Sequence, residues 1–386
     1  MRPNHLWDPS DIVLESQSFP IVSRLLRKGS HDKFEVHMNL LNHGCLLRWC
    51  SIVCSDARAF LFKLRGKRMA LNGSDIRARF NKKFMHLSKK NSRAEATLIL
   101  LVEMTAIASC VLVPLLILQH SWLAFVAVYW IAIAMIGMRM RCFGNIIHEC
   151  SHGGFVNDRA WNEAIGRLLS ILLLYSFANY RRDHITHHQY TGDYERDREF
   201  ADTAKFNFHE PLTSSRWLHY LRRFFVAETI LAYTGRTFLG SNESLPWKIA
   251  RLIYVGSLLA AVGGLVVLNP VAIIVVAFWI VPLCVVLPAI GYATDIMDHA
   301  GLLQNEDDID KARNYVVESA FIQWLIFPRN DSYHLFHHLF PAVSTRSFPE
   351  CHAILMSECP EYAARKHSLA EWVEDFRYRN PAPSIS

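Results

Sequence analysis

Long apolar runs alternate with polar segments along this chain, and they predict its main elements. Residues 97–118 are almost entirely apolar, and residues 121–138 repeat the pattern after a short polar turn. Residues 249–268 and 271–293 form a second pair of apolar runs, separated by a turn that contains proline. Because each run can cross a hydrocarbon core about 30 Å thick, we predict four transmembrane helices in two hairpins.

Basic residues lie on one side of these runs. The turn inside each hairpin carries no Lys or Arg, whereas the opposite ends of the spans do. By the positive-inside rule, both termini and the loop between the hairpins are then cytoplasmic. Glu103 lies inside the first run, and we expect it to snorkel to the cytoplasmic end or to face a neighbouring helix. The basic residues that flank the spans are Lys89, Lys90, Arg93, Arg139, Arg141, Lys248 and Arg251.

The remaining segments predict a helical cap on the cytoplasmic side. Residues 166–178 and 224–235 are apolar but too short to span, so we expect interfacial or buried helices there. The predicted fold class is therefore all-α, a multi-pass integral membrane protein with a cytoplasmic helical cap. The predicted domains are an N-terminal cytoplasmic extension at 1–93, a membrane domain at 94–345 and a C-terminal cytoplasmic tail at 346–386.

Composition is consistent with a chain that lies partly in a membrane. Of 386 residues, 51% are hydrophobic, and the formal net charge is +6. A charge excess of this size fits nucleic acid or a membrane surface, and the hydrophobic content favours the membrane, so we expect no nucleic-acid partner. The nine cysteines are scattered without a CxxC pair. We therefore expect reduced thiols, not a disulfide framework or a zinc-thiolate site.

Histidine is the residue type that carries the candidate chemistry. Nineteen residues are His, and eight of them fall into three groups, HECSH, HITHH and HLFHH. On a helix, spacings of three and four residues place the rings of one group on a single face. Each group follows the predicted cytoplasmic end of a span or lies in a cytoplasmic loop, so all three can reach one site. The eight residues are His148, His152, His184, His187, His188, His334, His337 and His338.

Two further donors lie at the end of the fourth apolar run. Asp295 and His299 are four residues apart and share a helical face, whereas we interpret Asp298 as a polar residue that caps the helix. Eight clustered histidines already exceed what one tetrahedral zinc can use, so we predict two metals. Imidazole-rich ligation with open positions favours redox-active iron over magnesium or calcium, and a structural zinc cluster is the alternative.

The motifs HECSH, HITHHQYTGDYERDREF and PRNDSYHLFHHLFP resemble the histidine boxes of the integral-membrane fatty acid desaturase and hydroxylase superfamily. The resemblance covers residues 148–341 and the first hairpin. It implies four transmembrane helices beneath a cytoplasmic cap, in which two irons activate O2. Asp295 lies where acyl-CoA desaturases carry Asn, and its carboxylate could bind iron directly or through water. The histidine ligands that the resemblance implies are His148, His152, His184, His187, His188, His299, His334, His337 and His338.

The resemblance also implies the activity. We expect an O2-dependent desaturase that introduces a double bond into an acyl chain on a lipid or an acyl carrier, with no separate acid or base. Hydroxylation or another oxygenation of a lipid is the alternative, since HECSH has three residues between its histidines, as in several lipid hydroxylases and some desaturases. A non-catalytic membrane metal-binding protein is the third hypothesis. The position of every histidine group outside the spans argues against it.

Electrons must come from another source, because the sequence shows no dinucleotide fingerprint, ferredoxin cysteine set or HPGG haem motif. We expect a separate donor, either ferredoxin or cytochrome b5 with its reductase. The basic residues Arg181, Arg182, Arg222 and Arg223 could dock an acidic donor or bind anionic lipid. Neighbouring acids could accept the second ring N–H of a metal-bound imidazole. The candidates are Glu149, Asp183, Asp193, Asp197 and Asp331.

Overall fold

The structure is a computed structural model that describes residues 71–238, 244–268 and 272–372. These residues belong to one compact unit, Ala70–Ser386. Most of the predicted N-terminal extension, the predicted turn at 269–270 and the end of the predicted C-terminal tail lie outside the described residues. Within the described part, the chain forms helices and two isolated β-bridges, and no strand. The all-α prediction is confirmed.

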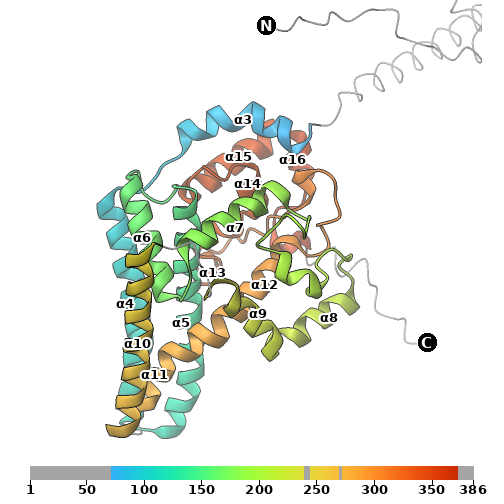
Figure 1. Ribbon diagram of the computed structural model, residues 1–386. Helices are drawn as coiled ribbons and strands as arrows, with labels where there is room; N and C mark the ends of the chain where they lie inside the picture. Colours follow the sequence, from blue (N-terminus) through green and yellow to red (C-terminus); the bar gives the residue numbers. More distant parts are fainter. Residues whose placement is uncertain (1–70, 239–243, 269–271, 373–386) are drawn as a thin grey trace, which may run out of the picture. The chain divides into compact units, whose positions relative to one another are not determined.

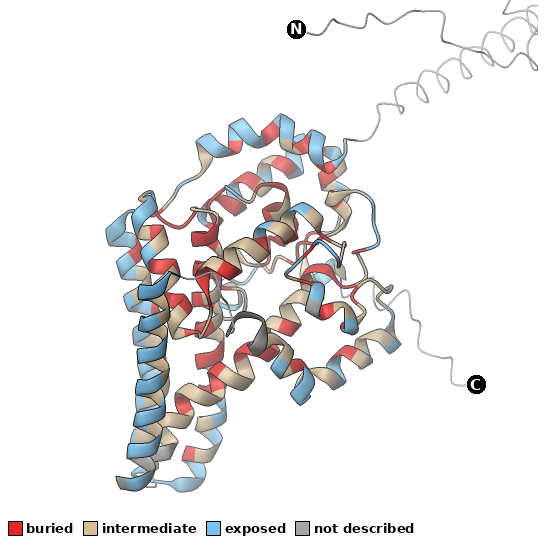
Figure 2. Ribbon diagram, in the orientation of Figure 1, coloured by how far each residue is buried: buried red, intermediate tan, exposed pale blue. Residues whose placement is uncertain are grey.

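Four helices are long and apolar enough to cross a membrane, as predicted. They run side by side, and their outward side chains are exposed and apolar, as lipid contact requires (Figures 1 and 2). The fourth span is composite, because a π-helical segment joins two α-helices. The spans are α4 (Arg93–Leu118), α5 (Trp122–Ser151), α10 (Leu245–Leu268) and the series α11 (Ala272–Val281), η3 (Pro282–Val286) and α12 (Leu287–His299).

Two of these helices continue past the apolar runs that predicted them. Helix α5 extends beyond residue 138 to Ser151, because Met140, Phe143 and Ile147 keep an apolar face that is buried in the main core. Helix α12 extends beyond residue 293 to His299 in the same way. The first histidine group and His299 therefore lie on the ends of spanning helices, not on loops.

The π-helical segment of the fourth span packs closely on α5. Gly137 of α5 faces Val286, and a Cβ at Gly137 would lie only 2.4 Å from a Val286 methyl carbon. The segment begins at Pro282, which has no N–H to donate in a regular helix. This close approach sets the position of α12, and thus of His299, relative to α5.

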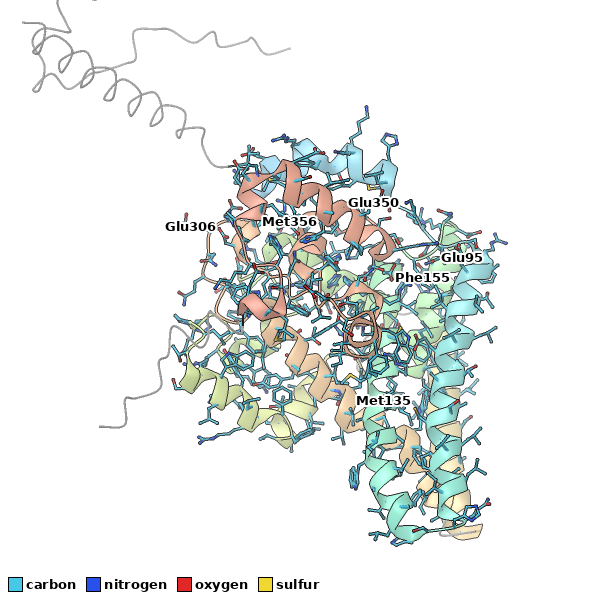
Figure 3. All side chains as sticks on the ribbon, turned by 180° about the vertical axis from the view of Figure 1, so that it is seen from behind. Glu95, Met135, Phe155, Glu306, Glu350 and Met356 are labelled. Carbon is cyan, nitrogen blue, oxygen red and sulfur yellow. The ribbon has the colours of Figure 1, made fainter. Side chains whose placement is uncertain are left out.

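Shorter helices form a cap around the ends of α5 and α12 (Figures 1 and 3). In Figure 3, Met135 marks the spanning part of α5, whereas Glu350 and Met356 mark cap helix α15 at the other end of the unit. The cap consists of α3 (Gly73–Leu87), α6 (Arg159–Leu172), α7 (Phe177–Tyr190), η2 (Ala201–Phe206), α8 (Ser214–Arg223), α9 (Ala227–Phe238), η4 (Asp308–Asp310), α13 (Ala320–Ile326), η5 (Pro328–Asn330), α14 (His334–Leu339), η6 (Thr345–Ser347), α15 (Phe348–Glu358) and α16 (Pro360–Ala363).

The predicted single helix at 166–178 is wrong, because the structure divides that segment between α6 and α7. Leu174 has a positive φ of 61°, which ends the first helix. The hydroxyl of Ser176 then accepts a hydrogen bond from the N–H of Asn179 and starts α7. The N-cap signal at Ser176 outweighs the apolar run, and it separates the second histidine group from α6.

The first residues described also contribute to the cap. Helix α3, which lies in the predicted N-terminal extension, packs Phe84 against Phe336 and Phe340 with ring centroids 5.7 and 4.8 Å apart. Phe336 belongs to the third histidine group. Aromatic pairs of this kind stabilise beyond the area that they bury. Helix α3 therefore supports the back of α14.

Glu103 faces a neighbouring helix, as predicted. Its carboxylate pairs with Arg139 of α5 at 3.1 Å, and both side chains are almost fully buried. Arg139 also donates hydrogen bonds to the carbonyl oxygens of Trp324 and Leu325, at 2.5 and 2.8 Å. Arg139, one of the flanking charges used to predict orientation, is thus a buried link between α4, α5 and α13.

Candidate metal centre

Helical spacing places the histidines of each group on one face of a helix. In α14, His334, His337 and His338 share one face, while Leu335 and Phe336 on the other face are buried in the cap core. In α5, His148 and His152 are four residues apart. The helix ends there because Gly153 adopts a positive φ of 67° and the N–H of Gly154 bonds to the Glu149 carbonyl.

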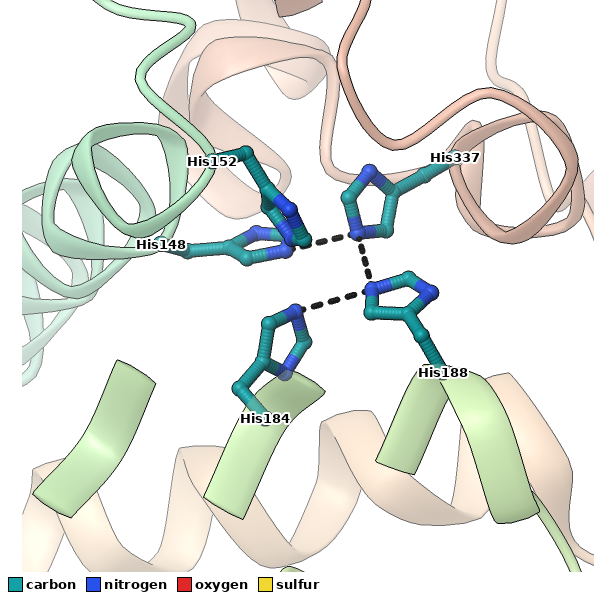
Figure 4. A group of neighbouring side chains, drawn as sticks. All are labelled: His148, His152, His184, His188 and His337. Carbon is teal, nitrogen blue, oxygen red and sulfur yellow. Dashed lines mark hydrogen bonds between the residues drawn. The ribbon is translucent and has the colours of Figure 1, made fainter. Parts of the chain in front are cut away.

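Five histidines from α5, α7 and α14 form the first cluster (Figure 4). One ring nitrogen from each residue lies within 4.8 Å of the others. Neighbouring Nε2 atoms are 2.7 Å apart for His148 and His337, 2.9 Å for His337 and His188, and 3.0 Å for His188 and His184. The fifth member, His152, stands beside these rings with centroid distances of about 5 Å.

Four histidines form the second cluster, again with ligand atoms within 4.8 Å of one another. His299 of α12 lies at its centre, with its Nε2 atom 3.2 Å from that of His187 and 2.8 Å from that of His334. His338 Nε2 is 3.0 Å from His334 Nε2. The rings of His338 and His188, from different clusters, are 4.5 Å apart, so the two clusters are adjacent.

Hydrogen bonds at the far ring nitrogens orient these imidazoles. The Nδ1 atoms of His184, His187 and His299 lie 2.7, 2.8 and 2.8 Å from Glu199, Asp197 and the Lys311 carbonyl. All three partners are acceptors, so each Nδ1 atom donates its hydrogen. The lone pair of each ring is then on Nε2, the atom that points into its cluster.

Burial keeps most of these rings neutral. It lowers the pKa of His188, His334, His337 and His338 well below the usual range, and the neighbouring imidazoles lower each pKa further. His187 differs: burial opposes protonation, but Asp197, through its charge and hydrogen bond, outweighs burial and raises the pKa of this residue. Neutral imidazole is the form that binds metal.

The donor set fits two metal ions. For a typical metal–imidazole bond of about 2.1 Å, two nitrogens on one ion lie roughly 3 Å apart, close to the Nε2 separations in both clusters. Nine imidazole nitrogens without a thiolate match the nitrogen-rich ligation typical of Zn, Cu, Fe and Ni. The structure brings together all nine predicted histidine ligands.

Asp295, the tenth predicted ligand, lies outside both clusters. Its Oδ2 atom accepts a hydrogen bond of 2.5 Å from the Tyr233 hydroxyl. A role in metal binding therefore stays a prediction. Asp298, interpreted from the sequence as a cap, is buried instead, with its carboxylate 3.5 Å from His334 Nδ1 and 2.7 Å from the Tyr315 hydroxyl that donates to it.

Of the five acids expected to orient the ligands, the structure places one against a histidine ring. Asp197 binds His187, whereas the other four pair with arginines. Glu199, which the sequence reasoning missed, takes the corresponding place at His184. The sequence does show an acidic segment after the second histidine group. It does not show how that loop folds, and so not which of its acids reaches a histidine. The arginine pairs are Glu149–Arg329, Asp183–Arg182, Asp193–Arg196 and Asp331–Arg141.

The Glu149–Arg329 pair positions the third histidine group. Arg329 and the next residue, Asn330, both have positive φ values, 65° and 58°. Such a backbone costs of order 1 kcal/mol per residue and needs support from its surroundings. Glu149 binds the Arg329 guanidinium at 2.8 Å, and Asn330 donates a hydrogen bond to the Thr345 carbonyl. The first histidine group thereby fixes the turn that leads to His334.

A cavity of about 200 Å³ lies beside the two clusters, between α5, α7, α9 and α12. Histidines from both clusters form part of its wall. The remaining wall is rich in polar side chains. The histidines that line the cavity are His148, His184, His187, His299 and His334.

Comparison with known proteins identifies the family. The family model for fatty acid desaturases matches residues 120–370, which include both histidine clusters and most of the cap. This chain belongs to the fatty acid desaturase family. The resemblance seen in the sequence is thereby confirmed, and the chain is an oxidoreductase of the membrane.

Individual relatives are distant from this desaturase-family chain. It is 26% identical to a dihydrorhizobitoxine desaturase of Bradyrhizobium elkanii over 67% of this chain and 74% of the relative. It is 30% identical to a chloroplastic sn-2 acyl-lipid omega-3 desaturase (ferredoxin) of Helianthus annuus over 30% of this chain and 24% of that protein. It is 34% identical to a Delta(12) fatty acid desaturase of Caenorhabditis elegans over 20% of each chain. The last two matches thus span a quarter or less of those proteins.

Proposed function

We propose that this chain is an O2-dependent di-iron desaturase that introduces a carbon–carbon double bond into an acyl chain. The convergence of nine histidines in two adjacent clusters supports this proposal most directly. We propose that the first cluster holds one iron and the second cluster the other. When bound, the irons supply the oxidising chemistry with O2 that removes hydrogen from an unactivated carbon.

The residues of the protein bind the substrate, orient the histidine rings and exclude water from the centre. Asp197 and Glu199 hold the rings of His187 and His184 with their lone pairs toward the metals. The cap covers the centre in part: five of the nine histidines are buried, and the other four are half-buried. The cavity beside the clusters is where we place the reacting part of the substrate.

We propose further that the centre faces the cytoplasm and receives electrons from a separate carrier, ferredoxin or cytochrome b5 with its reductase. A second cavity, of about 390 Å³, supports the proposal of a separate carrier, because it offers a docking site. It is lined by His152 of the first cluster together with Lys90, Arg159 and Arg181. An acidic carrier docked there would lie next to a metal ligand. Of the basic residues first considered, Arg181, Arg182 and Arg223 are paired with acids, so Lys90 and Arg159 are the basic residues on which the docking proposal depends.

The test is product analysis in a host of known lipid profile. The chain, its His187→Ala variant and a His120→Ala control are expressed with an electron donor, and total lipids are compared by mass spectrometry. His120 lies in the exposed turn between α4 and α5. We expect new species lighter by two hydrogens with the wild type and the control, and none with His187→Ala.

Other outcomes decide against the proposal. Products heavier by one oxygen atom that require His187 would replace desaturation with hydroxylation. Full activity in His187→Ala would show that the clusters are not the catalytic centre. Iron content of the purified proteins, measured in parallel, should fall in His187→Ala and stay unchanged in His120→Ala.

A further inference from the structure

Helix α14 carries three candidate ligands, yet it is only six residues long and no side chain of its own caps it. The first N–H groups of a helix have no acceptor within the helix, and the side chain of the N-cap residue commonly accepts from the second or third. Tyr333, the N-cap residue of α14, makes no such bond. The N–H of Leu335 donates instead to the Arg313 carbonyl, at 3.2 Å. The N–H of Phe336 donates to Oδ1 of the Asn314 side chain, also at 3.2 Å.

The amide of Asn314 is held in one orientation. Its side chain is fully buried, and its Nδ2 atom donates a hydrogen bond of 2.7 Å to the Tyr362 hydroxyl. His367 lies close by, with its Nδ1 atom 2.9 Å from Asn314 Nδ2 and its Nε2 atom 2.8 Å from the Tyr362 carbonyl oxygen. A carbonyl can only accept, so Nε2 carries the ring hydrogen and Nδ1 accepts from Asn314. Both amide hydrogens are thereby used, which leaves Oδ1 to accept from Phe336.

Both partners of the Asn314 amide belong to residues 360–372, part of the predicted C-terminal tail. Backbone and side-chain bonds join this segment to the residues around Asn314. The N–H of Val316 donates to the His367 carbonyl at 2.9 Å, and the indole N–H of Trp372 donates to the Asn314 carbonyl, also at 2.9 Å. The segment therefore supports the cap of α14 from behind.

Arg313 makes the corresponding contacts at the end of a spanning helix. Its guanidinium donates to the carbonyl oxygens of Ile296 and Ala300, at the C-terminal end of α12 beside His299. The last carbonyl groups of a helix lack partners within it, and a basic side chain can satisfy them. Arg313 and Asn314, adjacent in sequence, thus bind the end of α12 and the start of α14.

The two histidine clusters depend unequally on these two helix ends. In the second cluster, three of the four histidines lie on them: His299 on α12, and His334 and His338 on α14. The first cluster takes only His337 from α14, and its other four histidines come from α5 and α7. A shift of Arg313 and Asn314 would therefore displace most of the second cluster and little of the first.

We propose that Arg313 and Asn314 are positioning residues of the second histidine cluster, and that residues 360–372 hold Asn314 in the orientation that this role needs. The proposal rests on the proposed function, because it takes each cluster to bind one metal ion. Asn314 acts through a backbone N–H of α14, so it sets where the rings stand and leaves their chemistry unchanged. Without its Oδ1 atom, the buried N–H of Phe336 loses its acceptor, and the first turn of α14 is free to move.

The test is a metal titration of the purified full chain, stripped of metal with a chelator. Co2+ is the probe, since its visible absorption reports each bound ion, and we expect the wild type to bind one ion per cluster. In Asn314→Ala, one site should weaken by about 10–100-fold, as when a ligand loses its support, while the other stays within about twofold. Asn305→Ala is the matched control and should bind like the wild type. It removes an exposed amide, bonded to the Asp310 carbonyl, from the same connection between α12 and α13.

Two further variants identify the weakened site and the role of the C-terminal segment. His338 belongs to the second cluster alone, so His338→Ala should weaken the same site. Combined with Asn314→Ala, its effect on that site should be smaller than the product of the two single effects, because both changes act on one set of ligands. Tyr362→Phe keeps the ring but removes one partner of the Asn314 amide. It should weaken the same site by roughly 3–10-fold, the effect of one neutral hydrogen bond, and it decides the matter if Asn314→Ala does not fold.

Equal weakening of both sites in Asn314→Ala would mean a general loosening of the fold and would overturn the inference. Wild-type affinity at both sites in Asn314→Ala or in Tyr362→Phe would overturn it as well. If the chain desaturates lipids while Asn314→Ala binds metal normally, the desaturase proposal holds and this inference does not. If the titrations follow expectation but the chain oxidises no lipid, this inference holds and the desaturase proposal fails. A wild type that binds fewer than two ions would overturn both the assignment of the clusters and this inference.

Discussion

At the scale of single residues, the contact between His187 and Asp197 controls the second cluster. Both side chains are buried, and the Nδ1 and Oδ2 atoms are 2.8 Å apart. The other oxygen of Asp197 accepts hydrogen bonds from the backbone N–H groups of Glu199 and Phe200. The carboxylate is therefore fixed before any metal binds, and it fixes the ring in turn.

We predict that Asp197→Asn lowers metal affinity or activity by about 10–100-fold, the usual effect of removing a carboxylate that holds a ligand histidine. The amide is neutral, so the ring loses the charge that makes it a stronger donor. Iron per chain and competition with a chelator measure the effect. Asp193→Asn, on the exposed part of the same loop, is the control. Unchanged iron binding in Asp197→Asn would mean that the hydrogen bond is not needed.

The same residues show what the sequence could predict at this scale. Helical spacing alone was enough to select the nine histidines, because i, i+3 and i+4 positions share a face whatever the tertiary fold. The acids that contact these histidines were harder to predict. Glu199 and Asp193 lie in the same short loop, and only the folded path of that loop turns one toward His184 and the other toward Arg196. Sequence spacing carries no information on that path.

At the scale of helices, Arg139 joins three elements inside the membrane region. Its guanidinium pairs with Glu103 of α4, lies over the Trp324 ring at 4.1 Å, and donates to two carbonyl groups at the end of α13. Helix α13 itself is short, and Phe321 is 65% exposed on it. It therefore depends on Arg139 for its position more than on packing of its own.

We predict that Arg139→Met destabilises the fold by about 3–5 kcal/mol, the usual cost of leaving a buried charge without its partner. It also leaves the Trp324 and Leu325 carbonyl groups without their donor. Thermal unfolding in detergent measures the change. Arg93→Met is the matched control, because Arg93 at the start of α4 pairs on the surface with Asp158, the N-cap residue of α6, and exposed pairs contribute little. Equal unfolding temperatures for the two variants would contradict this account.

Helix ends show the limits of the apolar pattern. The pattern identified all four spans, because length and hydrophobicity are sufficient for that purpose. The pattern ended before Ser151 and His299, because polar histidines interrupt an apolar run without interrupting a helix. It also missed the break at Leu174, where a positive φ and the N-cap at Ser176 end α6 despite continuing apolar residues. Local caps decide these boundaries, not hydropathy.

At the scale of the whole unit, the two histidine clusters connect parts of the chain that are far apart in sequence. Their histidines come from α5, α7, α12 and α14, so two spanning helices and two cap helices meet at this candidate metal centre. Within each cluster, Nε2 atoms of neighbouring imidazoles lie 2.7–3.2 Å apart. Without a cation, the lone pairs on these atoms repel one another. Bound metal should therefore hold the spans and the cap together as one cooperative structure.

We predict that metal removal lowers the unfolding temperature of the whole unit. A ligand at about 100 times its Kd stabilises the folded state by roughly 2.7 kcal/mol, and the effect grows with tighter binding. Unfolding of the metal-loaded protein is followed in detergent with and without a chelator. In His337→Ala, which removes a ring that contacts both His148 and His188, the chelator should have a smaller effect. If the chelator lowers the unfolding temperatures of wild type and variant equally, the metal stabilises the protein at some other site and the two clusters are not its ligands.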